Sequence, residues 1–175
     1  MALTVETGSG LADANAFISE ADADTYHEAR GNTDWTDNNT GDKEAAIRRA
    51  TAILSGYSWQ GLRTNRRDQA LAWPRISVYD AEGWAIASDE IPQEVKDACA
   101  EMAMRELVAP GSLQPDVTLS DSLKREKIGQ IEVEYLGGNS SASGFVPILT
   151  VIAPLIDQFL LKPTNGGGTT WLMRV

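Results

Sequence analysis

The chain has 175 residues, of which 42% are apolar, so it can form one domain with a real core. It carries 25 Asp and Glu residues against 15 Lys and Arg, a formal net charge of -10. Generic nucleic-acid binding depends on Lys and Arg that neutralise phosphates, so this balance argues against a generic DNA binder. The single cysteine, Cys99, excludes an intramolecular disulfide and indicates a reducing compartment.

The first helix is predicted after an irregular N-terminal arm that runs to Ile18. Ser19 is a helix cap, and Gly31 supplies the stop. His27, the only histidine of the chain, is expected at a surface position of this helix. Asn32 to Gly41 is interpreted as a polar, solvated loop, because it lacks the glycine position and the closing glutamate of a calcium-binding loop.

Two longer helices are predicted at Asp42 to Ser55 and at Pro92 to Val108. In the first, one apolar stripe faces the core while four charged residues face outward: Lys43, Glu44, Arg48 and Arg49. In the second, the expected buried face consists of Val95, Ala98, Cys99, Met102, Ala103 and Leu107. Since Cys99 belongs to that face, it is interpreted as a core thiol and not as a nucleophile.

The connector between these helices is unusually aromatic, with Tyr57, Trp59, Trp73, Tyr79 and Trp84. Loops over a solvated surface do not normally contain so many large apolar side chains. We therefore expect the connector to fold back between the helices, with its own core at Trp59, Trp73, Pro74 and Arg75.

The connector also holds the main cationic concentration of the chain, at Arg63, Arg66, Arg67 and Arg75. One interpretation is that these arginines pair with carboxylates of the same or a neighbouring subunit. The other is contact with DNA phosphates, which requires the arginines to share a face.

Beyond Gly111 the pattern changes. Ile131, Val133 and Tyr135 alternate with glutamates, which predicts a strand. Its partner is expected between Val117 and Lys127, although Ser122 to Glu126 also suits a helical turn. A last helix opens at Pro147, with a kink or a start near Ala153 because Pro154 lies inside it.

The C-terminal tail follows a run of three glycines, which is typical of a flexible hinge. Its apolar residues either dock onto another subunit or a portal surface, or form a frayed end: Trp171, Leu172, Met173 and Val175.

No pattern in the chain indicates an enzyme. The single histidine excludes histidine-pair metal sites, and no phosphate-binding glycine loop or nucleophile elbow is present. We expect no cofactor and no metal. The most apolar segment, Phe145 to Ile156, is interrupted by prolines and too short for a membrane span, so no membrane partner is expected.

The predicted fold class is mainly α: a small bundle of about four to five helices with a β-hairpin or loop extension and an extended C-terminal arm. Within one structural domain, we place the arm and bundle at 1–110, the extension at 111–146, and the last helix with its docking arm at 147–175.

One ordered set of segments resembles the head–tail adaptor family of tailed phages, also called connector or head-completion proteins. The segments are the Ser-capped helix with Ala-Asp-Ala-Asp-Thr-Tyr, then Trp35, Ala-Ala-Ile-Arg-Arg-Ala-Thr-Ala-Ile-Leu, Tyr57-Ser-Trp59, Gln69-Ala-Leu-Ala-Trp-Pro-Arg75 and Ile91-Pro-Gln-Glu-Val95. Members are often labelled DnaT-like single-stranded-DNA-binding proteins.

The resemblance implies a virion protein of the neck, made in the host cytoplasm, that assembles as a homo-oligomeric and usually dodecameric ring. Its partners would be the portal protein and a tail-terminator, stopper or tail protein. Packaged double-stranded DNA would pass through the lumen without specific binding. Arg63, Arg66 and Arg67 would then make contacts between subunits or with DNA.

The alternative function is a DnaT-like single-stranded-DNA-binding accessory protein of replication. Its mechanism would be stacking of bases on Trp59, Trp73 or Trp84 beside the arginines.

Overall fold

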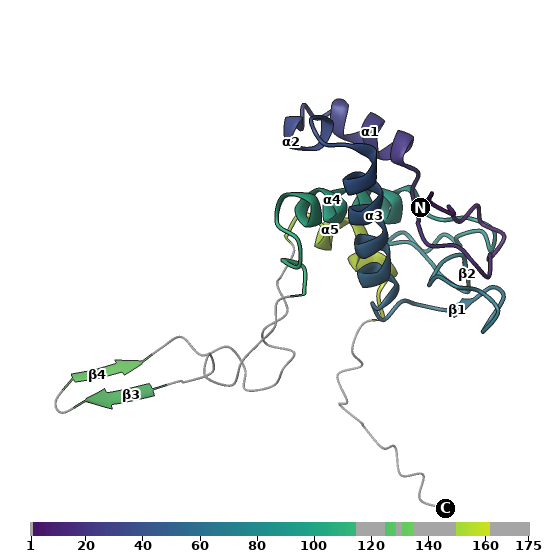
Figure 1. Ribbon diagram of the computed structural model, residues 1–175. Coiled ribbons are helices and arrows are strands. Elements are labelled where there is room, and N and C mark those ends of the chain that lie inside the picture. The colour runs from purple at the N-terminus through teal and green to yellow at the C-terminus, as the bar shows by residue number, and fades with distance from the viewer. Residues whose placement is uncertain (1, 115–124, 129–130, 135–149, 162–175) are drawn as a thin grey trace, which may run out of the picture.

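The computed structural model of the chain describes residues 2–114, 125–128, 131–134 and 150–161 (Figure 1). Within these ranges the α-helices are α1 (Glu20–Glu28), α2 (Thr33–Thr36), α3 (Thr40–Ser55), α4 (Gln93–Val108) and α5 (Ala153–Ile156), followed by a 3-10 helix, η3 (Asp157–Phe159). Four short strands form two antiparallel hairpins: β1 (Leu62–Arg63) with β2 (Arg75–Ile76), and β3 (Arg125–Ile128) with β4 (Ile131–Glu134). The predicted class, a mainly α small bundle with a β-hairpin, is confirmed.

The core forms where α3 packs against α4. Both helices bury the small and apolar stripe that their sequence spacing predicts, and α5 packs against α4. The central residues are Ala46, Ile47, Ala50, Leu54, Val95, Ala98, Cys99, Met102 and Ala103. Cys99 is fully buried, as expected for a core thiol, and burial raises its pKa to about 11. Leu107, expected in this face, is only half-buried, and Glu106 is buried instead.

The N-terminal arm is held by the carboxylate of Glu6, which accepts backbone N–H bonds from Gly8, Gly10 and Leu11 at 2.8–3.0 Å. A carboxylate that accepts several amide hydrogens tolerates burial, since its charge is satisfied. The arm ends in Phe17 and Ile18, which are buried against the helices. Irregular backbone is therefore anchored at both of its ends.

The surface position expected for His27 is wrong, because its ring is buried between α1 and α4. Nε2 lies 3.2 Å from the carbonyl oxygen of Ala100, and Asn32 donates to Nδ1 at 3.0 Å. The ring also packs on Trp35, with centroids 4.5 Å apart. The single histidine therefore serves packing, and its pKa is lowered, mainly by burial.

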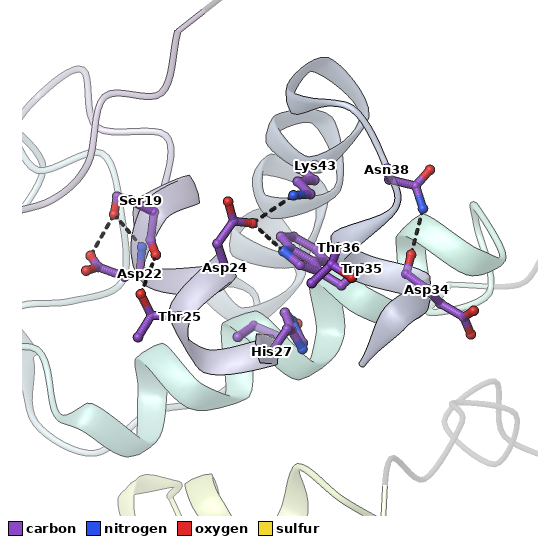
Figure 2. Close-up of polar contacts among 12 residues, drawn as sticks. Ser19, Asp22, Asp24, Thr25, His27, Asp34, Trp35, Thr36, Asn38 and Lys43 are labelled. Carbon is purple, nitrogen blue, oxygen red and sulfur yellow. Dashed lines mark hydrogen bonds and ion pairs between the residues drawn. The ribbon is translucent and has the colours of Figure 1, made fainter. Parts of the chain in front are cut away.

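The expected solvated loop from Asn32 to Gly41 is also wrong in its middle, where α2 forms and Trp35 is fully buried. The indole N–H of Trp35 donates to Asp24 at 2.7 Å (Figure 2). Lys43, expected to face outward, is buried and lies 2.9 Å from the same carboxylate oxygen. One carboxylate on α1 thus satisfies a lysine and an indole at once, which sequence spacing does not reveal.

The observed helices begin directly after their capping residues, and one of them begins earlier than the sequence predicts. Ser19 caps α1 by accepting the Asp22 N–H at 3.1 Å, as predicted. Asn39 caps α3 by accepting the Asp42 N–H at 3.1 Å, so α3 begins two residues before the predicted Asp42. The last helix begins at Ala153, as the proline pattern predicts; Pro147 lies outside the described residues.

The connector closes the bundle with a chain of aromatic rings. Trp73 makes edge-to-face contacts with Trp59 and Phe159, at centroid distances of 5.6 and 5.7 Å, and all three are buried. The peptide bond between Trp73 and Pro74 is cis. Tyr79 and Trp84, expected to plug the same space, are instead exposed. Trp59 and Trp73 therefore belong to the core, whereas Tyr79 and Trp84 do not.

The β3–β4 hairpin pairs Arg125 with Glu134 and Ile128 with Ile131. It confirms the strand predicted at Ile131. Of the two alternatives for the segment before it, the structure shows a partner strand at Arg125–Ile128 and not a helical turn. Figure 1 draws the hairpin away from the helices. Among the described residues, none of the helices has both the length and the apolar character that a membrane span requires.

Candidate functional site

The four arginines of the connector share one face of the molecule. Arg63, Arg66, Arg67 and Arg75 line a hollow of about 430 Å³ together with Leu62. We call these five residues the arginine hollow. It lies on the β1–β2 hairpin, and the sequence pattern predicts the residues but not their convergence.

Strand register brings two of the arginines opposite one another. Leu62 pairs with Ile76 and Arg63 pairs with Arg75. Gly61 makes this approach possible at φ +64, because a Cβ there would collide with the carbonyl oxygen of Ile76. Like charges directly opposite each other destabilise a sheet, so this pairing has to be maintained by other contacts.

Those contacts are made by the guanidinium of Arg75, which is buried and donates to backbone carbonyls. Nε donates to Gln60 at 2.6 Å, Nη1 to Ala72 at 2.9 Å, and Nη2 to Gly61 at 2.8 Å. Burial lowers the pKa of Arg75, and the charge of Arg63 lowers it further. Arg75 thus links the two strands and the loop of the connector through hydrogen bonds. Its positive charge remains in the lining of the hollow.

The loop between the two strands is held from inside by Gln69, which sequence reasoning did not single out. Its side-chain amide donates to the carbonyls of Leu71 and Pro74, both at 3.0 Å, and Arg63 donates to the Gln69 carbonyl at 3.2 Å. Gln69 is fully buried. A polar side chain directly before the apolar Ala-Leu-Ala-Trp run is the signal that could have identified it.

The charge of the hollow has no acidic partner within the described ranges. None of its arginines forms an ion pair there, and Asp68, the one acid between residues 59 and 79, forms none either. Arg66 and Arg67 are exposed. Clustered cations that include a buried one are electrostatically costly, so this arrangement favours an anionic ligand or surface.

The hollow also has an apolar rim. Leu62 is 67% exposed, and its strand partner Ile76 is 39% exposed. Arginines beside exposed aliphatic side chains are typical of surfaces that bind another macromolecule, because the fork of the guanidinium recognises carboxylate or phosphate while the apolar part excludes water.

A family model described as "Putative DnaT-like ssDNA binding protein" matches residues 1–175, the whole chain. The chain belongs to this DnaT-like family. No curated protein and no solved structure matches it.

In this DnaT-like chain the three tryptophans that the sequence suggests for base stacking differ in their exposure to solvent. Trp59 and Trp73 are in the core, where their faces pack on other side chains, whereas Trp84 is 71% exposed. Only Trp84 of the three therefore has a free face. The predicted connector core of Trp59, Trp73, Pro74 and Arg75 is buried as a unit.

The predicted docking residues of the tail, Trp171, Leu172, Met173 and Val175, lie outside the described residues. Within the described residues of this DnaT-like chain, no group of three or more His, Cys, Asp or Glu side chains is placed to hold a metal ion.

Proposed function

We propose that the chain is a structural adaptor of a phage virion. In this role it forms a ring below the portal that extends the DNA channel and connects the head to the tail or stopper. The observation that carries the proposal is the arginine hollow itself, a cationic and partly apolar surface whose arginines form no ion pair among the described residues, on a chain with a net charge of -10. Such a surface fits a protein that offers both carboxylates and apolar area, because Leu62 and Ile76 are exposed beside the arginines.

A ring of acidic subunits suits a DNA channel, since a negative lumen lets DNA slide without sticking. The β3–β4 hairpin is consistent with assembly, because a two-stranded hairpin alone in water is marginally stable and gains from packing on a neighbour. The ring would place many copies of each contact side by side, so weak individual contacts would give strong attachment.

The second candidate is a single-stranded-DNA-binding protein of replication. The description of the DnaT-like family favours it, as does the exposed Trp84 on the same connector as the arginines. Two observations count against it. Trp59 and Trp73 are buried and offer no stacking face, and the acidic balance opposes binding to a phosphate backbone.

The test compares two binding partners of the full chain. Mixed with the portal protein of the same phage and viewed by negative-stain microscopy, the chain should add a ring to the portal. Against single-stranded DNA, we expect no binding at physiological salt. A micromolar or tighter affinity that falls steeply with salt, without any added ring, would overturn the proposal. In that case Trp84→Ala should weaken DNA binding by about 1–3 kcal/mol.

A further inference from the structure

Acidic side chains gather at the end of the molecule formed by α1, α2 and the start of α3. Residues 19–42 contain seven Asp and Glu against one arginine, Arg30. Asp24 is neutralised by Lys43. The remaining six form no ion pair within the described ranges, and we call them the acidic end: Glu20, Asp22, Glu28, Asp34, Asp37 and Asp42. Figure 2 shows the carboxylate of Asp34 pointing away from the helices.

The acidic end and the arginine hollow lie toward opposite ends of α3. In Figure 1, α1 and α2 sit beside the beginning of α3, and β1 and β2 lie toward its other end. A helix of 16 residues spans roughly 24 Å at about 1.5 Å per residue. Physiological salt screens exposed charges beyond about 8 Å, so the two surfaces do not neutralise one another within one chain.

We infer that the arginine hollow receives carboxylates of the acidic end of a second copy of this chain. The inference rests on the proposed function and names the contact through which neighbouring subunits meet. Because this contact joins two different surfaces, each copy can bind the next in the same way. Such a head-to-tail contact generates a ring when the rotations between successive subunits add up to a full turn.

The chemistry of the hollow fits a carboxylate-bearing protein surface. Arg66 and Arg67 are exposed and can form bidentate pairs with carboxylates. The exposed Leu62 adds apolar contact area, which a row of phosphates would not use.

Two charge-reversed forms of the full chain test the contact. The first is Arg66→Glu with Arg67→Glu, and the second is Glu28→Arg with Asp34→Arg; all four positions are exposed. Each form alone loses the charge complementarity of one of the two surfaces, so each should sediment as a monomer at low salt where the wild type associates. Mixed in equal amounts, the two forms should associate again, because each supplies the charge that the other lacks.

Glu82→Arg with Glu90→Arg is the matched control for the second form, since it also replaces two acids by two arginines, at exposed positions of the connector outside both surfaces. It should associate as the wild type does. Recovery in the mixture also excludes misfolding, because two unfolded chains would not rescue one another.

Three results would overturn the inference: a wild type that stays monomeric at every soluble concentration, reversed forms that associate like the wild type, or a mixture that stays monomeric. Portal binding separates this failure from that of the proposed function. If Arg66→Glu with Arg67→Glu still adds a complete ring to the portal, the adaptor role stands and only the contact is wrong. If the wild type adds no ring and binds single-stranded DNA through the hollow, both the adaptor role and the proposed contact are wrong.

Discussion

The carboxylate of Glu106 on α4 lies 3.0 Å from Nε of Arg49 on α3, although Glu106 is only 1% exposed. The same carboxylate accepts the backbone N–H of Gly111 at 3.0 Å and of Leu113 at 3.3 Å. These amides follow the end of α4, so Glu106 fixes the chain as it leaves the helix. A buried charge is tolerated here because three donors surround it.

Glu106→Ala should lower the free energy of unfolding by about 3 kcal/mol, because two amides beyond α4 lose a charged acceptor together with the ion pair. Urea unfolding followed by circular dichroism measures the change. Glu28→Ala, at an exposed position of α1, is the control and should stay within about 0.5 kcal/mol of the wild type. Equal losses in the two variants would contradict the role given to Glu106.

Two buried tryptophans should respond differently to the same substitution. The indole N–H of Trp59 donates to the Leu54 carbonyl at 2.9 Å, whereas that of Trp73 has no hydrogen-bond acceptor among the described residues. Trp59→Phe removes this indole hydrogen bond, and the Leu54 carbonyl then keeps only the Tyr57 N–H, at 3.1 Å. Trp59→Phe should therefore cost about 1 kcal/mol more than Trp73→Phe, which loses no hydrogen bond. Chemical denaturation of both variants gives the difference. Trp84→Phe serves as the exposed reference, and a larger loss for Trp73→Phe would refute the assignment.

The guanidinium of Arg75 cannot be replaced by an ammonium group. Lysine lacks the planar fork that reaches the carbonyls of Gln60, Gly61 and Ala72 together. Arg75→Lys should therefore destabilise the fold by about 2 kcal/mol. Arg67→Lys, at an exposed position of the same hollow, keeps the charge and should be close to neutral. Thermal unfolding of both variants decides the matter; similar melting temperatures would contradict the structural role of Arg75.

The sequence predicts the regular parts of this fold well. The stripes of α3 and α4, the cap at Ser19 and the start of the last helix near Ala153 follow from periodicity, capping and proline chemistry. These signals are local, since each depends on residues within a few positions of each other.

The errors at Lys43, Trp35 and His27 concern polar or aromatic residues whose partners are distant in sequence. Lys43 and Trp35 are buried because both meet Asp24, and His27 is buried because the Ala100 carbonyl accepts a hydrogen bond from its ring. Spacing along one helix gives no information on such pairs.

The arginine hollow is only partly predictable from the sequence. Its residues are evident as a cluster in the sequence, but a common face depends on the β1–β2 register and on the buried side chain of Gln69. Neither a two-residue strand nor a single buried amide leaves a periodic signal.

The buried ring of His27 should make stability depend on pH. The Ala100 carbonyl can only accept, so Nε2 carries the proton, and Nδ1 accepts from Asn32. Protonation would turn Nδ1 into a donor facing another donor, and burial already lowers the pKa of His27.

In the unfolded chain the histidine pKa is about 6.5, so the unfolded state binds more protons than the native state as the pH falls through this value. The stability that neutral His27 contributes is complete above this pH and is lost progressively below it. His27→Gln has no titrating group at this position, so its stability deficit relative to the wild type should shrink between about pH 7.5 and pH 5.5. Urea titrations of both proteins across this range measure the difference. A deficit that stays constant or grows on acidification would show that the imidazole accepts a proton in the fold without cost.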